Sequence, residues 1–172
     1  MSDSEQEWTK TKEEKFVRFV MDRIHKDNGL RAKLSRANNE STEYQSWEIL
    51  APWCSLDKDW ERLPYGLIGA SLAKARLEKD GFLGIGEAIA KCYEDGNQSD
   101  QAKAKLRRLI ACKTVAEACR ILRPLFSLIE SKGAPLKYSQ LLHELLHFNP
   151  DWTPAKWAQN FYGRASTEGD LA

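Results

Sequence analysis

The most specific chemical pattern in the chain is His143-Glu144-Leu145-Leu146-His147, which has the H-E-x-x-H spacing of zinc peptidases. Histidines four residues apart lie on one face of a helix and can share a metal ion, while the glutamate activates a bound water molecule. Such a site requires a third ligand, and the carboxylates downstream, Asp151, Glu168 and Asp170, are poor candidates for it. We therefore expect no metal and no cofactor, and we retain a zinc metallopeptidase only as a third hypothesis.

Two other patterns share residues with catalytic motifs but lack the context that those motifs need. The segment Gly81-Phe82-Leu83-Gly84-Ile85-Gly86 has spaced glycines, but no strand precedes it and no Lys-Ser or Lys-Thr pair follows. It therefore indicates a helix connection rather than a nucleotide loop. Serine, cysteine and histidine are all present, but the chain has no nucleophile turn and three histidines in total. We expect no catalytic residue and no enzyme activity.

Neither the cysteines nor the N-terminal residues indicate secretion. The four cysteines, Cys54, Cys92, Cys112 and Cys119, show no C-x-x-C spacing and lie among helix-forming residues. They are expected to be reduced residues of the core. The first residues lack the basic and apolar regions of a signal peptide, and no apolar run is long enough to span a bilayer. We expect a cytoplasmic protein without a membrane partner.

The net charge of +1 conceals an uneven distribution of charged residues. Between Ser99 and Lys137 there are nine basic and three acidic residues, a local charge of +6, so the rest of the chain carries −5. The segment from Gly29 to Asn39 is also basic, with three cations and no acid. Either stretch alone is compatible with an ordinary solvated helix face. Two such stretches in one chain favour a polyanionic partner.

Helices must position these charges, because apolar residues recur at helical spacing and no segment alternates as a strand does. Capping boxes at Thr11 and Glu14 and at Thr114 and Glu117 mark two helix starts, and Pro124 should kink or divide the second helix. We predict an all-α, compact bundle of about eight to nine helices. The predicted helices cover residues 11–28, 30–37, 44–51, 65–79, 86–93, 99–112, 114–133, 136–147 and 153–162.

The 172 residues fit a single helical domain, which we expect to consist of two small lobes, about residues 10–96 and 99–163. The ends, residues 1–8 and 164–172, are expected to be frayed. Tyr44, Trp47 and Leu50 form the apolar stripe of the third predicted helix, and Trp53 and Trp60 flank the connection after it. We expect these aromatic side chains to lie in the core.

Five segments of the chain occur in an order that resembles a known family over about residues 16–162. They are Leu30-Arg31-Ala32-Lys33-Leu34-Ser35-Arg36, Gly69-Ala70-Ser71-Leu72-Ala73, Lys105-Leu106-Arg107-Arg108-Leu109-Ile110-Ala111-Cys112-Lys113, Leu122-Arg123-Pro124-Leu125 and Trp157-Ala158-Gln159-Asn160-Phe161-Tyr162. Their order and spacing resemble the CasB family, the small subunit of the type I-E CRISPR Cascade complex.

The resemblance implies a non-enzymatic helical subunit that is present as a pair within an antiviral guide-RNA complex. Its implied partners are a second copy of itself, the backbone and large Cascade subunits, the guide RNA and the target DNA. Cations on helix faces neutralise phosphates without reading bases, which suits the stabilisation of an R-loop whose sequence is read by the guide. The residues expected to contact phosphates are Arg31, Lys33, Arg36, Lys105, Arg107, Arg108, Lys113, Arg120 and Arg123. The second hypothesis is a helical adaptor whose basic faces bind acidic proteins.

Overall fold

The structure is a computed structural model of the chain, and it describes residues 10–163. Within this range it contains nine α-helices, two short 3₁₀-helices and no strand. The elements are α2 (Lys12–Ile24), α3 (Asn28–Leu34), η1 (Glu43–Ser46), α4 (Trp47–Leu50), α5 (Asp59–Ala75), α6 (Ile85–Lys91), η2 (Gly96–Gln98), α7 (Asp100–Ile110), α8 (Val115–Lys132), α9 (Tyr138–Leu146) and α10 (Thr153–Tyr162). The prediction of an all-helical bundle is confirmed.

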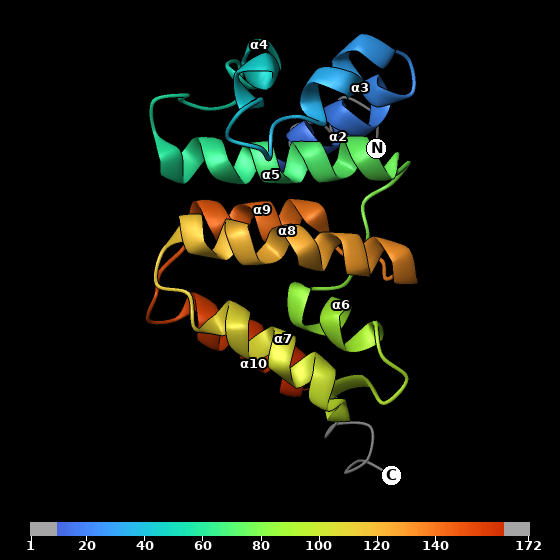
Figure 1. Ribbon diagram of the computed structural model, residues 1–172, viewed down its shortest axis with the longest axis vertical. Helices are drawn as coiled ribbons and strands as arrows, with labels where there is room; N and C mark the ends of the chain where they lie inside the picture. The colour runs from blue at the N-terminus through green and yellow to red at the C-terminus, as the bar shows by residue number, and fades with distance from the viewer. Residues whose placement is uncertain (1–9, 164–172) are drawn as a thin grey trace.

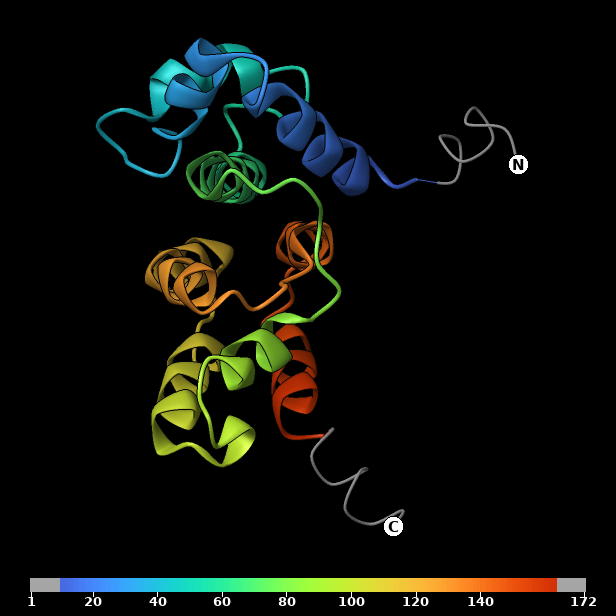
Figure 2. The ribbon, with the colours of Figure 1, turned by 90° about the vertical axis from the view of Figure 1, so that its right-hand side faces the viewer.

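The helices form three tiers along the long axis of the molecule (Figure 1). In the first tier α2, α3 and α4 lie over α5, which in turn packs against α8 and α9 in the middle tier. The third tier consists of α6, α7 and α10, and α6 and α10 have the most extensive packing of any pair. Figure 2 shows α5, α8 and α9 nearly end-on between the two outer groups. Helices α5, α8 and α9 therefore lie between α2, α3 and α4 on one side and α6, α7 and α10 on the other.

The helix starts confirm the local capping signals. The Thr11 hydroxyl accepts a hydrogen bond from the backbone N–H of Glu14 at 3.2 Å, and Thr114 accepts one from Glu117 at the same distance. Ser99 caps α7 by accepting from the N–H of Ala102. Each cap satisfies a backbone donor that has no partner within the helix. The basic helices α7 and α8 thus begin where the sequence predicts.

The prediction that the aromatic residues around position 50 lie in the core is wrong for three of them. Tyr44, Trp47 and Trp60 are 60%, 37% and 51% exposed. The apolar stripe is carried by only four residues of 3₁₀-helix and four of α-helix, which is too short to hold all of its large side chains against α5. Trp53 instead packs against the rings of Phe16 and Phe19, with centroid distances of 5.3 and 5.4 Å.

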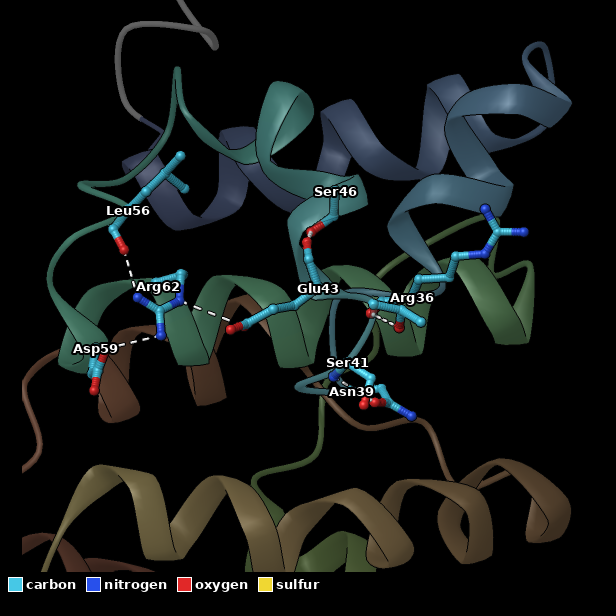
Figure 3. A network of polar contacts seen from close by, with 9 residues as sticks. Arg36, Asn39, Ser41, Glu43, Ser46, Leu56, Asp59 and Arg62 are labelled. Carbon is cyan, nitrogen blue, oxygen red and sulfur yellow. Dashed lines mark hydrogen bonds and ion pairs between the residues drawn. The ribbon is translucent and has the colours of Figure 1, made fainter.

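Helix α5 begins six residues before the predicted start at Tyr65 and continues through Pro64. The first turn is held by Arg62, whose guanidinium donates to the carbonyl of Leu56 at 2.5 Å and pairs with Asp59 at 2.8 Å and Glu43 at 3.5 Å (Figure 3). An internal proline removes one helical hydrogen bond, and here the helix continues past it. The helix ends at Ala75 rather than Lys79, because Arg76 adopts a left-handed conformation with φ of 52°.

Pro124 does not divide α8, which runs unbroken from Val115 to Lys132 and ends at Gly133 in the left-handed conformation. The side chains at Cys119, Leu122 and Phe126 are buried on one face of this helix. Pro124 is exposed on another face, so its ring points away from the packed side of the helix. The burial of the opposite face therefore outweighs the single hydrogen bond that proline removes.

The first and middle tiers are also joined through Asp80, which lies between α5 and α6. One oxygen of its carboxylate accepts from the N–H of Tyr138 at 2.7 Å, and the other accepts from the hydroxyl and the N–H of Ser139. Beside it, Leu83 forms an isolated parallel bridge with Leu136, with a hydrogen bond of 2.8 Å from Lys137 N–H to the Leu83 carbonyl. Asp80 thus caps α9 from a segment about 58 residues upstream.

Replacing Asp80 by alanine should lower the free energy of unfolding by about 1–2 kcal/mol, because the first N–H groups of α9 lose their acceptor. The measurement is urea unfolding followed by circular dichroism. Asp57→Ala is the matched control, because Asp57 is exposed and has no hydrogen bond within the described residues. Equal stability of the two variants would contradict the capping role of Asp80.

The predicted division into lobes at about residues 96–99 stays a prediction. Helix α6, on the N-terminal side of that boundary, packs against α10, α7 and α8. The predicted frayed ends lie outside the described residues. Between residues 10 and 163, no helix is long and apolar enough to cross a membrane.

Candidate nucleic-acid interface

The strongest candidate for a polyanion site is the surface of α7 and α8. Each helix is amphipathic, and burial of Ala102, Leu106 and Leu109 fixes the rotation of α7 about its axis. This rotation exposes Arg107 and Arg108, while Lys105 is half-buried. Because α7 and α8 are linked by a short connection, the basic residues of both helices belong to one continuous stretch of chain.

We use the name α7–α8 cation group for the six predicted phosphate contacts in this stretch: Lys105, Arg107, Arg108, Lys113, Arg120 and Arg123. All but Lys105 are exposed. Within residues 10–163, none of these six side chains forms an ion pair with an acidic residue. Their positive charge is therefore available to an external anion.

Two of these cations, Arg120 and Arg123, border cavities between α8 and the segment that follows α3. The larger cavity, about 280 Å³, is also lined by Asn39 and Glu43. The second, about 230 Å³, is lined by Arg123 together with Asn38, Lys74 and Glu130. Figure 3 shows Asn39 and Ser41 between α5 and α8, where the Asn39 amide oxygen accepts from the Ser41 N–H at 2.9 Å.

Lys74 is a basic residue at this groove that was not predicted from the sequence. Its ammonium donates to the side-chain oxygen of Asn38 at 3.1 Å, which holds it beside the same cavity as Arg123. The only sequence signal was an isolated lysine near the end of a long apolar helix. The contact depends on the approach of α5 to the segment after α3, which local patterns do not encode.

The three predicted contacts near α3 have partners inside the protein. The Arg31 Nε donates to the Ala73 carbonyl of α5 at 3.1 Å, so this side chain fastens α3 to α5. Lys33 is paired with Glu48. Arg36 donates to the Gln45 side chain at 2.6 Å, and Figure 3 shows its guanidinium directed away from α8. These three side chains thus have partners within the protein, unlike the α7–α8 cation group, and their contact with phosphate stays a prediction.

His143, on α9, and His147, which caps the end of this helix, are exposed, while Tyr138, Leu141, Leu142 and Leu145 form the buried face of α9. Glu144 is also buried, at 8% exposure, which was not predicted from the sequence. Burial raises the pKa of its carboxyl group. The Trp157 indole lies close to this carboxyl and opposes the rise, although Nε1 of Trp157 and Oε1 of Glu144 lack a hydrogen bond of good geometry.

The structure brings a third residue that could bind a metal ion close to these histidines, from the other end of the chain. Glu13, on α2, places its Oε1 3.2 Å from Nδ1 of His143, and Glu13, His143 and His147 can each present a ligand atom within 4.8 Å of the others. Only carboxylates downstream of His147 were considered from the sequence. No local pattern points to Glu13, because the pairing spans 130 residues.

The cysteines are free and buried, as predicted. Burial raises the pKa of all four thiols, to about 11 for Cys54 and about 12 for Cys119. A thiol with a raised pKa stays protonated near neutral pH and is a poor nucleophile. These residues therefore contribute to packing rather than to chemistry.

Solved structures share this fold over nearly its full extent. A chain of a CRISPR RNA-guided surveillance complex is similar with a TM-score of 0.74 and 20% sequence identity, covering 93% of this chain and 96% of the other. A CRISPR-associated protein of the Cse2 family from Thermus thermophilus has a TM-score of 0.69 at 18% identity, covering 88% and 97%. CasB from Thermobifida fusca has a TM-score of 0.59 at 16% identity, covering 88% and 98%.

The sequence itself identifies the family. The family model of CRISPR-associated protein Cse2 matches residues 30–162, which is most of the chain. No curated protein matches it in sequence. The resemblance to the CasB family is confirmed, since Cse2 and CasB name one family and proteins under both names share the fold. The chain belongs to the family of CRISPR-associated protein Cse2.

Proposed function

We propose that this chain is a non-catalytic small subunit of a type I-E RNA-guided Cascade complex, and that its α7–α8 cation group holds nucleic-acid backbone. Its family is CRISPR-associated, and one protein of similar fold is a chain of an RNA-guided surveillance complex. The proposed partners are the backbone and large subunits, a second copy of this chain, the guide RNA and the target DNA.

The observation that carries this proposal is the absence of ion-pair partners for the α7–α8 cation group within the described residues. Lys and Arg side chains that face solvent gain free energy by displacing counterions from phosphates. Such contacts position a strand without reading its bases. Because duplex opening and guide pairing nearly balance in free energy, a few backbone contacts are enough to favour the open R-loop.

The non-catalytic part of the proposal is supported by the position of Glu144. A general base must reach the water or substrate whose proton it takes. The Glu144 carboxyl is buried beside Trp157, whereas His143 and His147 are exposed. The glutamate of the H-E-x-x-H pattern is therefore shielded from solvent, while the two histidines are not.

The test replaces Arg107, Arg108 and Lys113 together by alanine and measures binding to unrelated single-stranded and duplex DNA at several salt concentrations. We expect similar weakening for all sequences, with the salt slope reduced by roughly 0.7–0.9 for each phosphate that the variant no longer neutralises. In reconstituted complex, the same variant should load guide RNA normally but shorten the lifetime of the R-loop.

The matched control removes the same number of positive charges from α2 and the residues just after it, by changing Arg18, Arg23 and Lys26 to alanine. These residues are exposed and lie in the first tier, away from α7. The control should keep the wild-type salt slope. Equal slopes for the wild type and both triple variants would reject the α7–α8 cation group as a phosphate site and favour a protein adaptor.

A further inference from the structure

We propose that Glu13, His143 and His147 form a binding site for a zinc-class divalent ion, which links α2 to α9. Each of the three can present a ligand atom within 4.8 Å of the others. One carboxylate and two imidazoles are a common protein ligand set for Zn²⁺. The site is independent of the α7–α8 cation group and of the proposed function.

The pair that joins the two helices has a geometry close to that of two ligands on one ion. Nδ1 of His143 lies 3.2 Å from Oε1 of Glu13. Two ligands bound to one tetrahedral Zn²⁺ at about 2.0–2.1 Å are separated by about 3.3 Å. The two atoms therefore already have nearly the separation that a shared ion requires. Both residues lie on helices that pack against each other, so the backbone on each side is fixed.

The Glu13 carboxylate can accept a further partner. Its side chain is 10% exposed, and within the described residues its sole ion-pair and hydrogen-bond partner is His143. A carboxylate with one contact retains several unused lone pairs, and a bound divalent cation would use one of them.

The orientation of His147 also suits a metal ligand. Its Nδ1 lies 2.9 Å from the backbone carbonyl of His143, and a carbonyl can only accept, so Nδ1 carries the proton. In that tautomer Nε2 carries the lone pair that can bind a metal ion. Metal-binding histidines usually donate their other N–H to a carbonyl or carboxylate in this way, which fixes the tautomer. The two rings lie side by side, with centroids 4.2 Å apart.

The arrangement indicates a linking role for the ion rather than a catalytic one. Three protein ligands leave a coordination position for water, and both histidines are exposed, so the ion can exchange with solvent. Glu144 is buried away from the histidines and does not serve as a base for that water. The ion would join residues 130 positions apart in the chain and so stabilise the contact of α2 with α9.

The experiment is titration of the untagged, chelator-treated full chain with Zn²⁺ by calorimetry, together with melting curves with and without the ion. We expect one ion per chain, and a rise in Tm of about 5–10 °C when free Zn²⁺ is 100-fold above Kd. Mg²⁺ should have no effect, because it prefers oxygen ligands. Absence of stoichiometric Zn²⁺ binding would overturn the proposal and leave Glu13 and His143 as a hydrogen-bonded pair.

Variants locate the ion. Glu13→Gln and His147→Gln keep the approximate size of the side chain, and each should weaken Zn²⁺ binding at least tenfold. His25→Ala, which removes the only other histidine of the chain, is the control and should bind as the wild type does. Each variant is compared with itself in the presence and absence of Zn²⁺, so any change in intrinsic stability cancels. Wild-type affinity in both Gln variants would also overturn the proposal.

Discussion

Replacing Trp157 by alanine is expected to lower the free energy of unfolding by about 3–5 kcal/mol. Trp157 is 1% exposed and is the largest of the fully buried side chains. It packs against the ring of Phe148, and its own helix α10 rests on α6. Its removal would leave a cavity beside the buried Glu144 carboxyl, in addition to removing the packing of the indole itself. The Tm should fall by about 6–20 °C in a melting experiment.

Trp152→Ala is the control, because it removes the same side chain five residues earlier in the chain. Trp152 is 63% exposed, so its loss should change the free energy of unfolding by less than about 0.5 kcal/mol. A small effect at Trp157 would mean that the α6–α10 face is not part of the core. It would then be a candidate surface for docking to another subunit.

Helix boundaries that depend on neighbouring residues could be predicted from the sequence. The caps of α2, α7 and α8 lie where Thr11, Ser99 and Thr114 place them, and Gly133 ends α8 as expected. The reason is that a cap needs only a side-chain oxygen and an N–H three residues away. The start of α5 is different, since it depends on contacts of Arg62 with Leu56 and Glu43.

The burial of single side chains in short elements was less predictable. The spacing of Tyr44, Trp47 and Leu50 fits a helix stripe, but of these three only Leu50 is buried. Trp53 contacts the Phe16 and Phe19 rings on α2, and that position is decided by how α2 crosses α5. A periodic pattern identifies a face of a helix without showing which distant element will cover it.

In the candidate site, too, features set by local sequence were predicted, whereas contacts between distant residues were not. The excess of positive charge on α7 and α8 is a property of composition and was predicted. The contacts of Lys33 with Glu48 and of Arg31 with the Ala73 carbonyl depend on tertiary packing and were not predicted. The contact of Glu13 with His143 also depends on tertiary packing. A metal site was rejected from the sequence because no third ligand was found, and Glu13 is a candidate for that ligand.

Replacing Gly86 by alanine should lower the free energy of unfolding by about 2–3 kcal/mol, although alanine is the better helix former. In a helix interior, alanine is favoured over glycine by about 1 kcal/mol. Here a methyl group would lie 2.6 Å from both the Phe161 nitrogen and the Trp157 carbonyl oxygen of α10. Because these are backbone atoms, α10 itself would have to move. Overpacking of this kind typically costs about 1–3 kcal/mol.

That movement would also break the polar contacts that fasten α10 to the start of α6. The Asn160 side chain accepts from the Glu87 N–H at 2.9 Å and donates to the Glu87 carboxylate at 2.8 Å. The comparison is Gly133→Ala, where φ is 68° and nothing lies within 4 Å of the added methyl group, so only the backbone conformation opposes alanine. That change should cost about 1–2 kcal/mol. If denaturant unfolding shows Gly86→Ala to be as stable as the wild type, α6 and α10 are not in close backbone contact.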